Sequence, residues 1–230
     1  MSGHDRRHPA VLFDLDGTLV DSVYQHVLAW RDALEETGIE LSVWRIHRRI
    51  GMSGGLFVNA LLRETKMALS SEQVSRLREL HLAAYLRRMD QIRPLPGARE
   101  LLQRLSELGV PWGIATSGSV RTAGPTIEML AIASPPVVVT RDDVARAKPD
   151  PDLFVEAARR LGVDVADSIV VGDSVWDLLA AQRARALGVG VLSGGYGREE
   201  LQQAGAYRVY DDPLDLGQHL DELGVREPVD

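Results

Sequence analysis

The chain has no cysteine among its 230 residues, no long apolar run and no excess of positive charge. Without cysteine it can form neither a disulfide framework nor a thiolate metal site. No apolar run approaches the ~20 residues that a transmembrane helix requires. The formal net charge is −7, which disfavours nucleic acid or an anionic membrane as a partner.

The composition is otherwise that of a globular protein, with 45% hydrophobic and 26% charged residues. The length suits one large α/β domain, or a core with a small insert. The first residues, Met1–Pro9, are polar and lack the apolar centre of a signal peptide. We therefore expect a cytoplasmic protein, either a monomer or a homodimer.

Short β-rich runs alternate with segments of helical periodicity through most of the chain. The runs are Val11–Leu15, Trp112–Thr116, Val137–Thr140, Ile169–Gly172, Val189–Leu192 and a weaker one at Tyr207–Tyr210. The helical segments between them are Gly97–Leu108, Val120–Leu130, Asp152–Leu161, Val175–Leu187, Arg198–Ala204 and Leu214–Leu223. This alternation predicts an α/β fold, a Rossmann-like parallel sheet with helices on both faces.

Residues 21–93 interrupt the alternation, because they carry helical periodicity without a strand. Val23, Val27 and Trp30 repeat at three- and four-residue spacing, and Ser70 with Gln73 has the pattern of a capping box. We expect residues 1–20 and 94–230 to form the core. Residues 21–93, here called the cap segment, are predicted to be an inserted all-helical domain over the active-site end of the sheet.

The sequence Asp14-Leu15-Asp16-Gly17-Thr18 directly follows the first apolar run, so it falls where a buried strand should end. Gly17 permits a turn that lets both carboxylates face a cleft. A hairpin turn is disfavoured because a helix follows, and a calcium loop is excluded because Leu19 and Gln25 occupy its glycine and glutamate positions. A solvated acidic turn remains the alternative.

Three further signals lie at strand ends. Thr116-Ser117-Gly118 offers a hydroxyl and backbone N–H groups to an anion, although Ser117 or Ser119 could simply cap a helix. Lys148 is followed by Pro149 and Pro151, which fix the backbone and so the direction of its ammonium group, although a lone lysine before a helix is usually solvated. Asp173 and Asp177 begin a helix and could serve only its dipole.

Taken together, these positions require less coincidence as one site than as separate caps. They all end at one edge of one sheet. Asp14, Asp16 and Asp173 supply oxygen ligands of the kind Mg²⁺ prefers, and Thr116 and Lys148 can hold phosphate oxygens. Positioning and charge neutralisation of this kind dominate phosphoryl transfer.

The order of these motifs resembles that of the haloacid dehalogenase-like superfamily over Val11 to about Tyr210. Asp14–Thr18 is similar to its first motif, Thr116 to its second, Lys148 to its third and Gly172–Asp177 to its fourth. The cap segment resembles the helical cap of the branch with phosphoglycolate phosphatases and β-phosphoglucomutases, and His26 and Trp30 also look like this branch.

The resemblance implies a role for each acidic residue. Asp14 would be the nucleophile, forming an aspartyl phosphate, and would also contact the metal. Asp16 would be general acid to the leaving alcohol and then base for water, with its backbone carbonyl on Mg²⁺. Asp173 would ligate Mg²⁺, and Asp177 would support the metal's waters or Lys148.

The remaining positions are expected to bind substrate. By the resemblance, Thr116 would hydrogen-bond the phosphoryl group and Lys148 would pair with Asp14 and phosphate. We place Gly17, Ser117 and Gly118 with them. In the cap segment, Arg49, rather than Arg48, is expected to reach the distal groups of the substrate, against the alternative that both are solvated.

The resulting prediction is a Mg²⁺-dependent phosphatase of a small phosphorylated metabolite, such as a sugar phosphate or a phosphoglycolate-like compound. A β-phosphoglucomutase-like isomerase is disfavoured because Gly172 stands where mutases commonly have Glu, and Gly54 where they have Arg. A dehalogenase would not require Asp16 or Asp173. A non-catalytic binding protein is the third alternative, although every motif position is filled.

Overall fold

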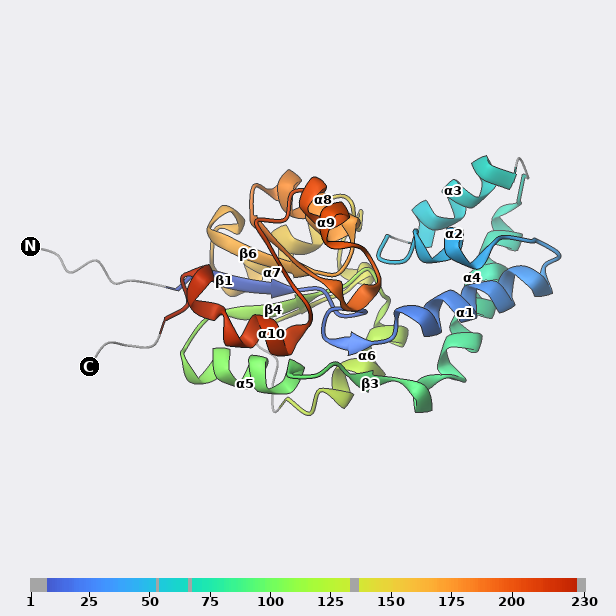
Figure 1. Cartoon of the computed structure of the whole chain (residues 1–230). Coiled ribbons are helices and arrows are strands. Elements are labelled where there is room, and N and C mark those ends of the chain that lie inside the picture. Colours follow the sequence, from blue (N-terminus) through green and yellow to red (C-terminus); the bar gives the residue numbers. More distant parts are fainter. Residues whose placement is uncertain (1–7, 53, 66–67, 133–136, 227–230) are drawn as a thin grey trace, which may run out of the picture.

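The computed structural model describes residues 8–52, 54–65, 68–132 and 137–226 of the chain. A six-stranded sheet forms its centre, with all neighbouring strands parallel and in the order β5-β4-β1-β6-β7-β8 (Figure 1). Its strands are β1 (Ala10–Phe13), β4 (Trp112–Ala115), β5 (Val138–Val139), β6 (Ser168–Gly172), β7 (Leu187–Val191) and β8 (Arg208–Tyr210). All six predicted β-rich runs thus contain strands, and the predicted fold class is confirmed.

Helices cover both faces of the sheet because the residues of β1 alternate between two cores. Val11 and Phe13 pack with residues of α5, α6 and α10, whereas Leu12 packs with residues of α7 and α8. These helices are α5 (Ala98–Glu107), α6 (Val120–Met129), α7 (Asp152–Leu161), α8 (Val175–Ala184) and α10 (Pro213–Gln218), and the short α9 (Arg198–Gln203) packs beside α8 and β8. Every residue of β1 is buried, as expected for a central parallel strand.

The cap segment forms a group of helices beyond the carboxyl end of β1 (Figure 1). They are α1 (Val23–Glu36), α2 (Val43–His47), α3 (Gly54–Thr65) and α4 (Ser71–Leu86). They have an apolar core of their own, in which the rings of Trp30 and Phe57 stack with centroids 4.2 Å apart. The predicted capping box of Ser70 and Gln73 begins α4. Where one domain ends and the other begins stays a prediction.

A two-stranded antiparallel ribbon joins the cap segment to the sheet, and the sequence pattern did not reveal it. The ribbon pairs β2 (Val20–Asp21) with β3 (Arg93–Pro94). The chain therefore leaves and re-enters the core at one place, beside the end of β1. This position puts the cap helices directly over the edge of the sheet at which the predicted site lies.

Of two other expectations, one is met only in part and the other falls mostly outside the described residues. The helix expected over Leu214–Leu223 ends at Gln218, and a 3-10 turn at Leu220–Leu223 replaces its second half. Of the polar start, Met1–Pro9, residues 1–7 lie outside the described residues. Within the part of the chain that the structure describes, no helix combines the length and apolar character needed to cross a membrane.

Candidate active site

The four strand-end signals meet at the carboxyl edge of the sheet. Asp14 follows β1, Thr116 follows β4, Asp173 follows β6, and Lys148 lies in the segment between β5 and α7. β1 is hydrogen-bonded to β4 on one side and to β6 on the other. Crevices at such a change of strand order are where open α/β sheets bind ligands. Gly17, with a φ of +85°, turns the chain after Asp16 as expected.

Lys148 is the centre of a buried ion-pair group. Its side chain is completely buried, and its Nζ donates to a carboxylate oxygen of Asp14 and lies 2.8 Å from Asp177 Oδ1. Burial alone would lower the pKa of Lys148, but these two carboxylates outweigh it and raise the pKa above its usual value. Lys148 is therefore a fixed cation rather than solvated surface.

The pKa values of Asp14 and Asp173 are both raised in this arrangement. Burial raises the pKa of Asp14 to about 7, against the opposing effect of Lys148. Burial, with the nearby charges of Asp177 and Asp14, also raises the pKa of Asp173 well above its ordinary value. One lysine thus does not neutralise three buried carboxylates, and the site favours an additional positive charge.

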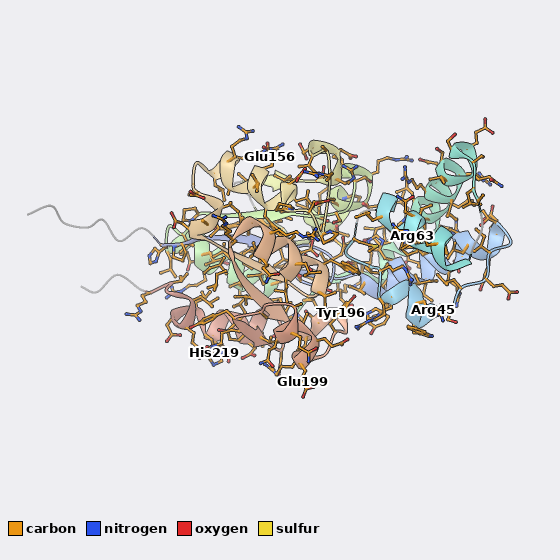
Figure 2. All side chains as sticks on the ribbon, turned by 90° about the horizontal axis from the view of Figure 1, so that it is seen from above. Arg45, Arg63, Glu156, Tyr196, Glu199 and His219 are labelled. Atoms are coloured by element: carbon orange, nitrogen blue, oxygen red, sulfur yellow. The ribbon has the colours of Figure 1, made fainter. Side chains whose placement is uncertain are left out.

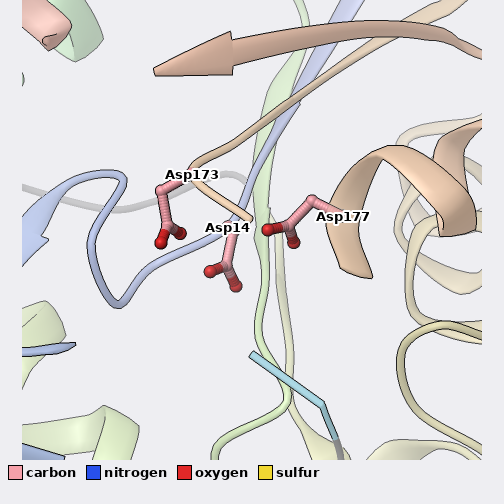
Figure 3. A group of neighbouring side chains, drawn as sticks. All are labelled: Asp14, Asp173 and Asp177. Atoms are coloured by element: carbon pink, nitrogen blue, oxygen red, sulfur yellow. The ribbon is translucent and has the colours of Figure 1, made fainter. Parts of the chain in front are cut away.

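The three carboxylates are close enough to share a metal ion. Each of Asp14, Asp173 and Asp177 offers an oxygen, and these oxygens all lie within 4.8 Å of one another. Figure 3 shows the carboxylate of Asp14 between the other two. Asp177 is already engaged, because its Oδ1 pairs with Lys148 and its Oδ2 accepts from both N and Oγ of Ser174. Asp14 and Asp173 therefore have more oxygen atoms available than Asp177.

A loop after β7 packs against Asp173, and the sequence did not predict this contact. Ser193 Oγ donates to the Gly17 carbonyl at 2.6 Å, which joins this loop to the first motif. A Cβ on Gly194 would lie only 1.7 Å from Asp173 Oδ2, so the absence of a side chain lets the carboxylate fit. On its other oxygen, Asp173 accepts a hydrogen bond of 3.2 Å from Thr18. Only the Gly-Gly pair after Ser193 hinted at a close approach of backbone.

Asp16 is turned away from the ion-pair group and toward the cap segment. Its Oδ1 accepts from Ser22 Oγ at 2.6 Å and lies 3.3 Å from His26 Nε2. Burial alone would raise the pKa of Asp16, but the charge of His26 and the hydrogen bonds from His26 and Ser22 hold it below its ordinary value. The position therefore stabilises a carboxylate that can exchange a proton with a group in the cavity.

A second histidine, His81 from α4, contacts His26. His26 Nδ1 and His81 Nε2 are 3.2 Å apart, and the ring of His26 stacks on that of Tyr85 with centroids 3.8 Å apart. Burial and the charge of His26 keep the pKa of His81 well below its usual value. The resemblance pointed to His26, but no role was predicted for Ser22, six residues from its partner Asp16, or for His81, whose partner His26 is 55 positions away.

Thr116, Ser117 and Gly118 line the same cavity as Asp14 and Asp16. Gly118 N donates to Thr116 Oγ1 at 3.0 Å, and Ser119, not Ser117, is the N-cap residue of α6. Ser117 Oγ is buried and has no hydrogen-bond partner among the described residues. Of the two helix-capping alternatives, the structure thus places only Ser119 at the cap. Ser117 is left with a free hydroxyl in the cavity that Asp14 also lines.

The cavity over these residues has a volume of about 610 Å³. Its lining combines Asp14, Asp16 and Thr116 with residues of the cap segment, including Arg49. Such a volume lies within the ~300–1,000 Å³ typical of small-molecule sites. The structure thus brings Arg49 into the cavity together with the core residues, while its role as a substrate ligand stays a prediction.

Arg48 instead fastens the cap segment to the core. Its guanidinium pairs with Glu200 and lies over the ring of Tyr196, 4.1 Å from the centroid. Its carbonyl accepts hydrogen bonds from Trp176 Nε1 and Tyr196 OH. Figure 2 shows Tyr196 at the junction of the two parts of the molecule. Neighbouring His47 adds a 2.8 Å hydrogen bond between its Nε2 and the Gly194 carbonyl.

Comparisons with known proteins agree with this geometry. The family description "haloacid dehalogenase-like hydrolase" matches residues 8–185. A phosphoglycolate phosphatase of Rhodospirillum rubrum is 32% identical, over 95% of this chain and 92% of that protein. Hexitol phosphatase A of Escherichia coli is 33% identical, over 75% of this chain and 78% of its own.

Among solved structures, that of a hydrolase from Pseudomonas syringae is similar with a TM-score of 0.91. Its sequence is 53% identical, and the alignment covers 94% of this chain and 99% of that one. The likeness therefore spans both the sheet and the cap helices.

Proposed function

Because the chain belongs to the haloacid dehalogenase-like hydrolases, we propose that it is a Mg²⁺-dependent phosphatase that acts through an aspartyl phosphate on Asp14. The enzyme class predicted from the sequence, a phosphoric monoester hydrolase, is confirmed by the matches to phosphatases. The substrate is proposed to be a small phosphorylated metabolite.

The observation that carries the proposal is the setting of Asp14. This carboxylate lies at the inner end of the cavity, with Lys148 on one side and Asp173 within reach of a shared cation on the other. With a metal ion bound there, a cation on each side would keep Asp14 ionised, as a nucleophile must be, and would offset the charge of an approaching phosphate. A merely structural ion pair would not require the open cavity.

The residues present fit a Mg²⁺ ion. Asp14 and Asp173 supply hard oxygen ligands, and burial, with the charges of the neighbouring carboxylates, raises the pKa of each. Mg²⁺ accepts a few carboxylates with waters and phosphate as the other ligands. By resemblance the Asp16 carbonyl would complete the protein's share, with Asp177 supporting from behind. The bound ion would neutralise phosphate charge during the reaction.

The first half of the proposed reaction is attack by Asp14. A carboxylate oxygen of Asp14 bonds to phosphorus while the bond from phosphorus to the ester oxygen breaks. Thr116, the free hydroxyl of Ser117 and the backbone at Gly118, which all line the cavity, hold the phosphoryl oxygens. Gly17, predicted to contribute to substrate binding, is not among the described lining residues. Lys148, immobilised between Asp14 and Asp177, balances the charge throughout.

Asp16 is the proposed general acid and general base. In its protonated form it donates to the departing alcohol oxygen, and the resulting carboxylate then takes a proton from the water that hydrolyses the aspartyl phosphate. Ser22 and His26 hold its carboxylate toward the cavity. Positioned proton transfer of this kind contributes about 10²–10⁴-fold to a rate.

We further propose a core of residues 1–20 and 94–230 with residues 21–93 as the cap domain. The cap would exclude water and contribute Arg49 to substrate recognition. We also propose a cytoplasmic enzyme, monomeric or homodimeric, without nucleic-acid or membrane partners.

Hydrolysis of p-nitrophenyl phosphate, with Mg²⁺ and with EDTA, tests the function. We expect Mg²⁺-dependent release of phosphate, and its loss in Asp14→Asn. Asp221→Asn, at an exposed position outside the cavity, is the matched control and should be fully active. Full activity of the Asp14 variant would contradict the mechanism. An isomerase would instead convert a phosphosugar without releasing phosphate.

A further inference from the structure

Four arginines line the cavity, namely Arg49, Arg78, Arg121 and Arg141. Outside the catalytic carboxylates, only Glu79 and Asp142 offer negative charge among the described lining residues. The lining outside the catalytic carboxylates therefore carries more positive than negative charge.

Three of these guanidinium groups already have partners. Arg49 Nη1 donates to the Arg45 carbonyl, and Arg141 Nη1 donates to the Val144 carbonyl at 2.6 Å. Arg121, from α6, reaches across to Glu79 of α4, with Nη1 at 2.9 and 3.2 Å from its two carboxylate oxygens. The negative charge of Glu79 is therefore neutralised by Arg121.

Arg78 is different, because it makes no hydrogen bond or ion pair within the described residues. It lies on α4 one turn before Leu82, which lines the same cavity. Its Nη2 is 3.4 Å from where a Cβ of Gly55 would lie, and a Cβ on Gly54 would meet nothing within 4 Å. The start of α3 thus leaves open space beside an unpaired guanidinium.

We propose that Arg78 binds a carboxylate at the far end of the substrate, so that the enzyme prefers phosphorylated acids of several carbons. This rests on the proposed phosphatase function. A guanidinium presents paired N–H donors that match a carboxylate. One unpaired guanidinium balances the single charge of a carboxylate, whereas a second phosphate carries nearly two charges.

The size of the cavity supports a substrate longer than two carbons. A volume of about 610 Å³ lies in the range that takes drug-sized ligands. The names of the relatives do not decide whether the non-phosphate part of the substrate is charged. Phosphoglycolate carries a carboxylate there, whereas a hexitol phosphate carries a neutral polyol. The charge at Arg78 favours the acidic alternative in this chain.

Two substrates of equal length isolate the effect of the carboxylate. 6-Phosphogluconate and glucitol 6-phosphate both have six carbons and differ at C1, which is a carboxylate in one and a primary alcohol in the other. We expect the unmodified enzyme to favour 6-phosphogluconate in kcat/KM by roughly three- to fivefold, as for a charged pair at a partly exposed site. The difference should arise mainly in KM.

Arg78→Ala should abolish this preference and leave hydrolysis of p-nitrophenyl phosphate unchanged. Arg76→Ala is the matched control, because Arg76 lies on the same helix but pairs with Glu36 outside the cavity. It should keep the preference. No preference in the unmodified enzyme, or a preference that persists in Arg78→Ala, would overturn the assignment of Arg78 while phosphatase activity stands. Absence of Mg²⁺-dependent hydrolysis of every ester would overturn the proposed function itself.

Discussion

Replacing Asp14 with asparagine should stabilise the metal-free protein at pH 8 while removing its proposed activity. The pKa of Asp14 is raised from 3.8 to about 7, with burial as the largest cause. Asparagine has nearly the shape of the protonated acid but never ionises. It therefore avoids the cost of holding a buried carboxylate beside two others.

The size and the direction of the effect follow from proton linkage. Because the folded-state pKa lies above the unfolded value, folding favours protonated Asp14. This contribution is fully present below about pH 4 and is lost as the pH rises through about 7. The difference from 3.8 to about 7 corresponds to about 4 kcal/mol of unfolding free energy, as an upper value.

Urea denaturation in EDTA at pH 5 and pH 8 measures this quantity. The gain in unfolding free energy of Asp14→Asn over the unmodified protein should be clearly smaller at pH 5 than at pH 8, because the loss begins near pH 4 and is complete only above about pH 7. Mg²⁺ at pH 8 should then stabilise the unmodified protein more than the variant, because the variant has lost a ligand. Asp221→Asn controls for the substitution itself. A variant less stable than the unmodified protein at pH 8 would refute the reasoning, since the ion pair with Lys148 would then outweigh desolvation.

Two further substitutions probe the neighbours of Asp14. Lys148→Met leaves buried carboxylates without their cation and should lower the unfolding free energy by about 3–5 kcal/mol at pH 8 in EDTA; a change below 1 kcal/mol in urea denaturation would show that Lys148 is not essential to their balance. Gly194→Ala places a Cβ 1.7 Å from Asp173 Oδ2, so the Mg²⁺ concentration for half-maximal hydrolysis should rise by roughly tenfold, a loss of about 1.4 kcal/mol in binding. An unchanged Mg²⁺ titration would mean that the loop containing Gly194 shifts without displacing the carboxylate of Asp173.

The sequence could predict the core of the candidate site because the ends of buried parallel strands can be recognised from the sequence. The apolar runs before Asp14 and Asp173 showed where each strand stops, and parallel strands bring their carboxyl ends to one edge. The fold class and the helical insert followed from the same periodicity. These residues are specified by their own local sequence.

Partners supplied by distant segments could not be predicted in that way. Ser193 and Gly17 are 176 positions apart, and His26 meets His81 across 55. Their contacts depend on how the cap helices and the loop after β7 pack against the sheet, which periodicity does not encode. Arg78 was missed for the same reason, because its helix phase shows only that it lies opposite the apolar core.

The contacts of Arg48 define a unit that does not coincide with any continuous piece of chain. Residues 193–200 belong in sequence to the sheet, yet Ser193 holds the first motif, Gly194 accepts from His47, and Glu200 pairs with Arg48. An engineer who exchanges cap segments between relatives to change substrate should therefore transplant this C-terminal stretch along with the helices. A chimera that carries only residues 21–93 would place a foreign loop against a surface that joins the cap segment to the rest of the molecule.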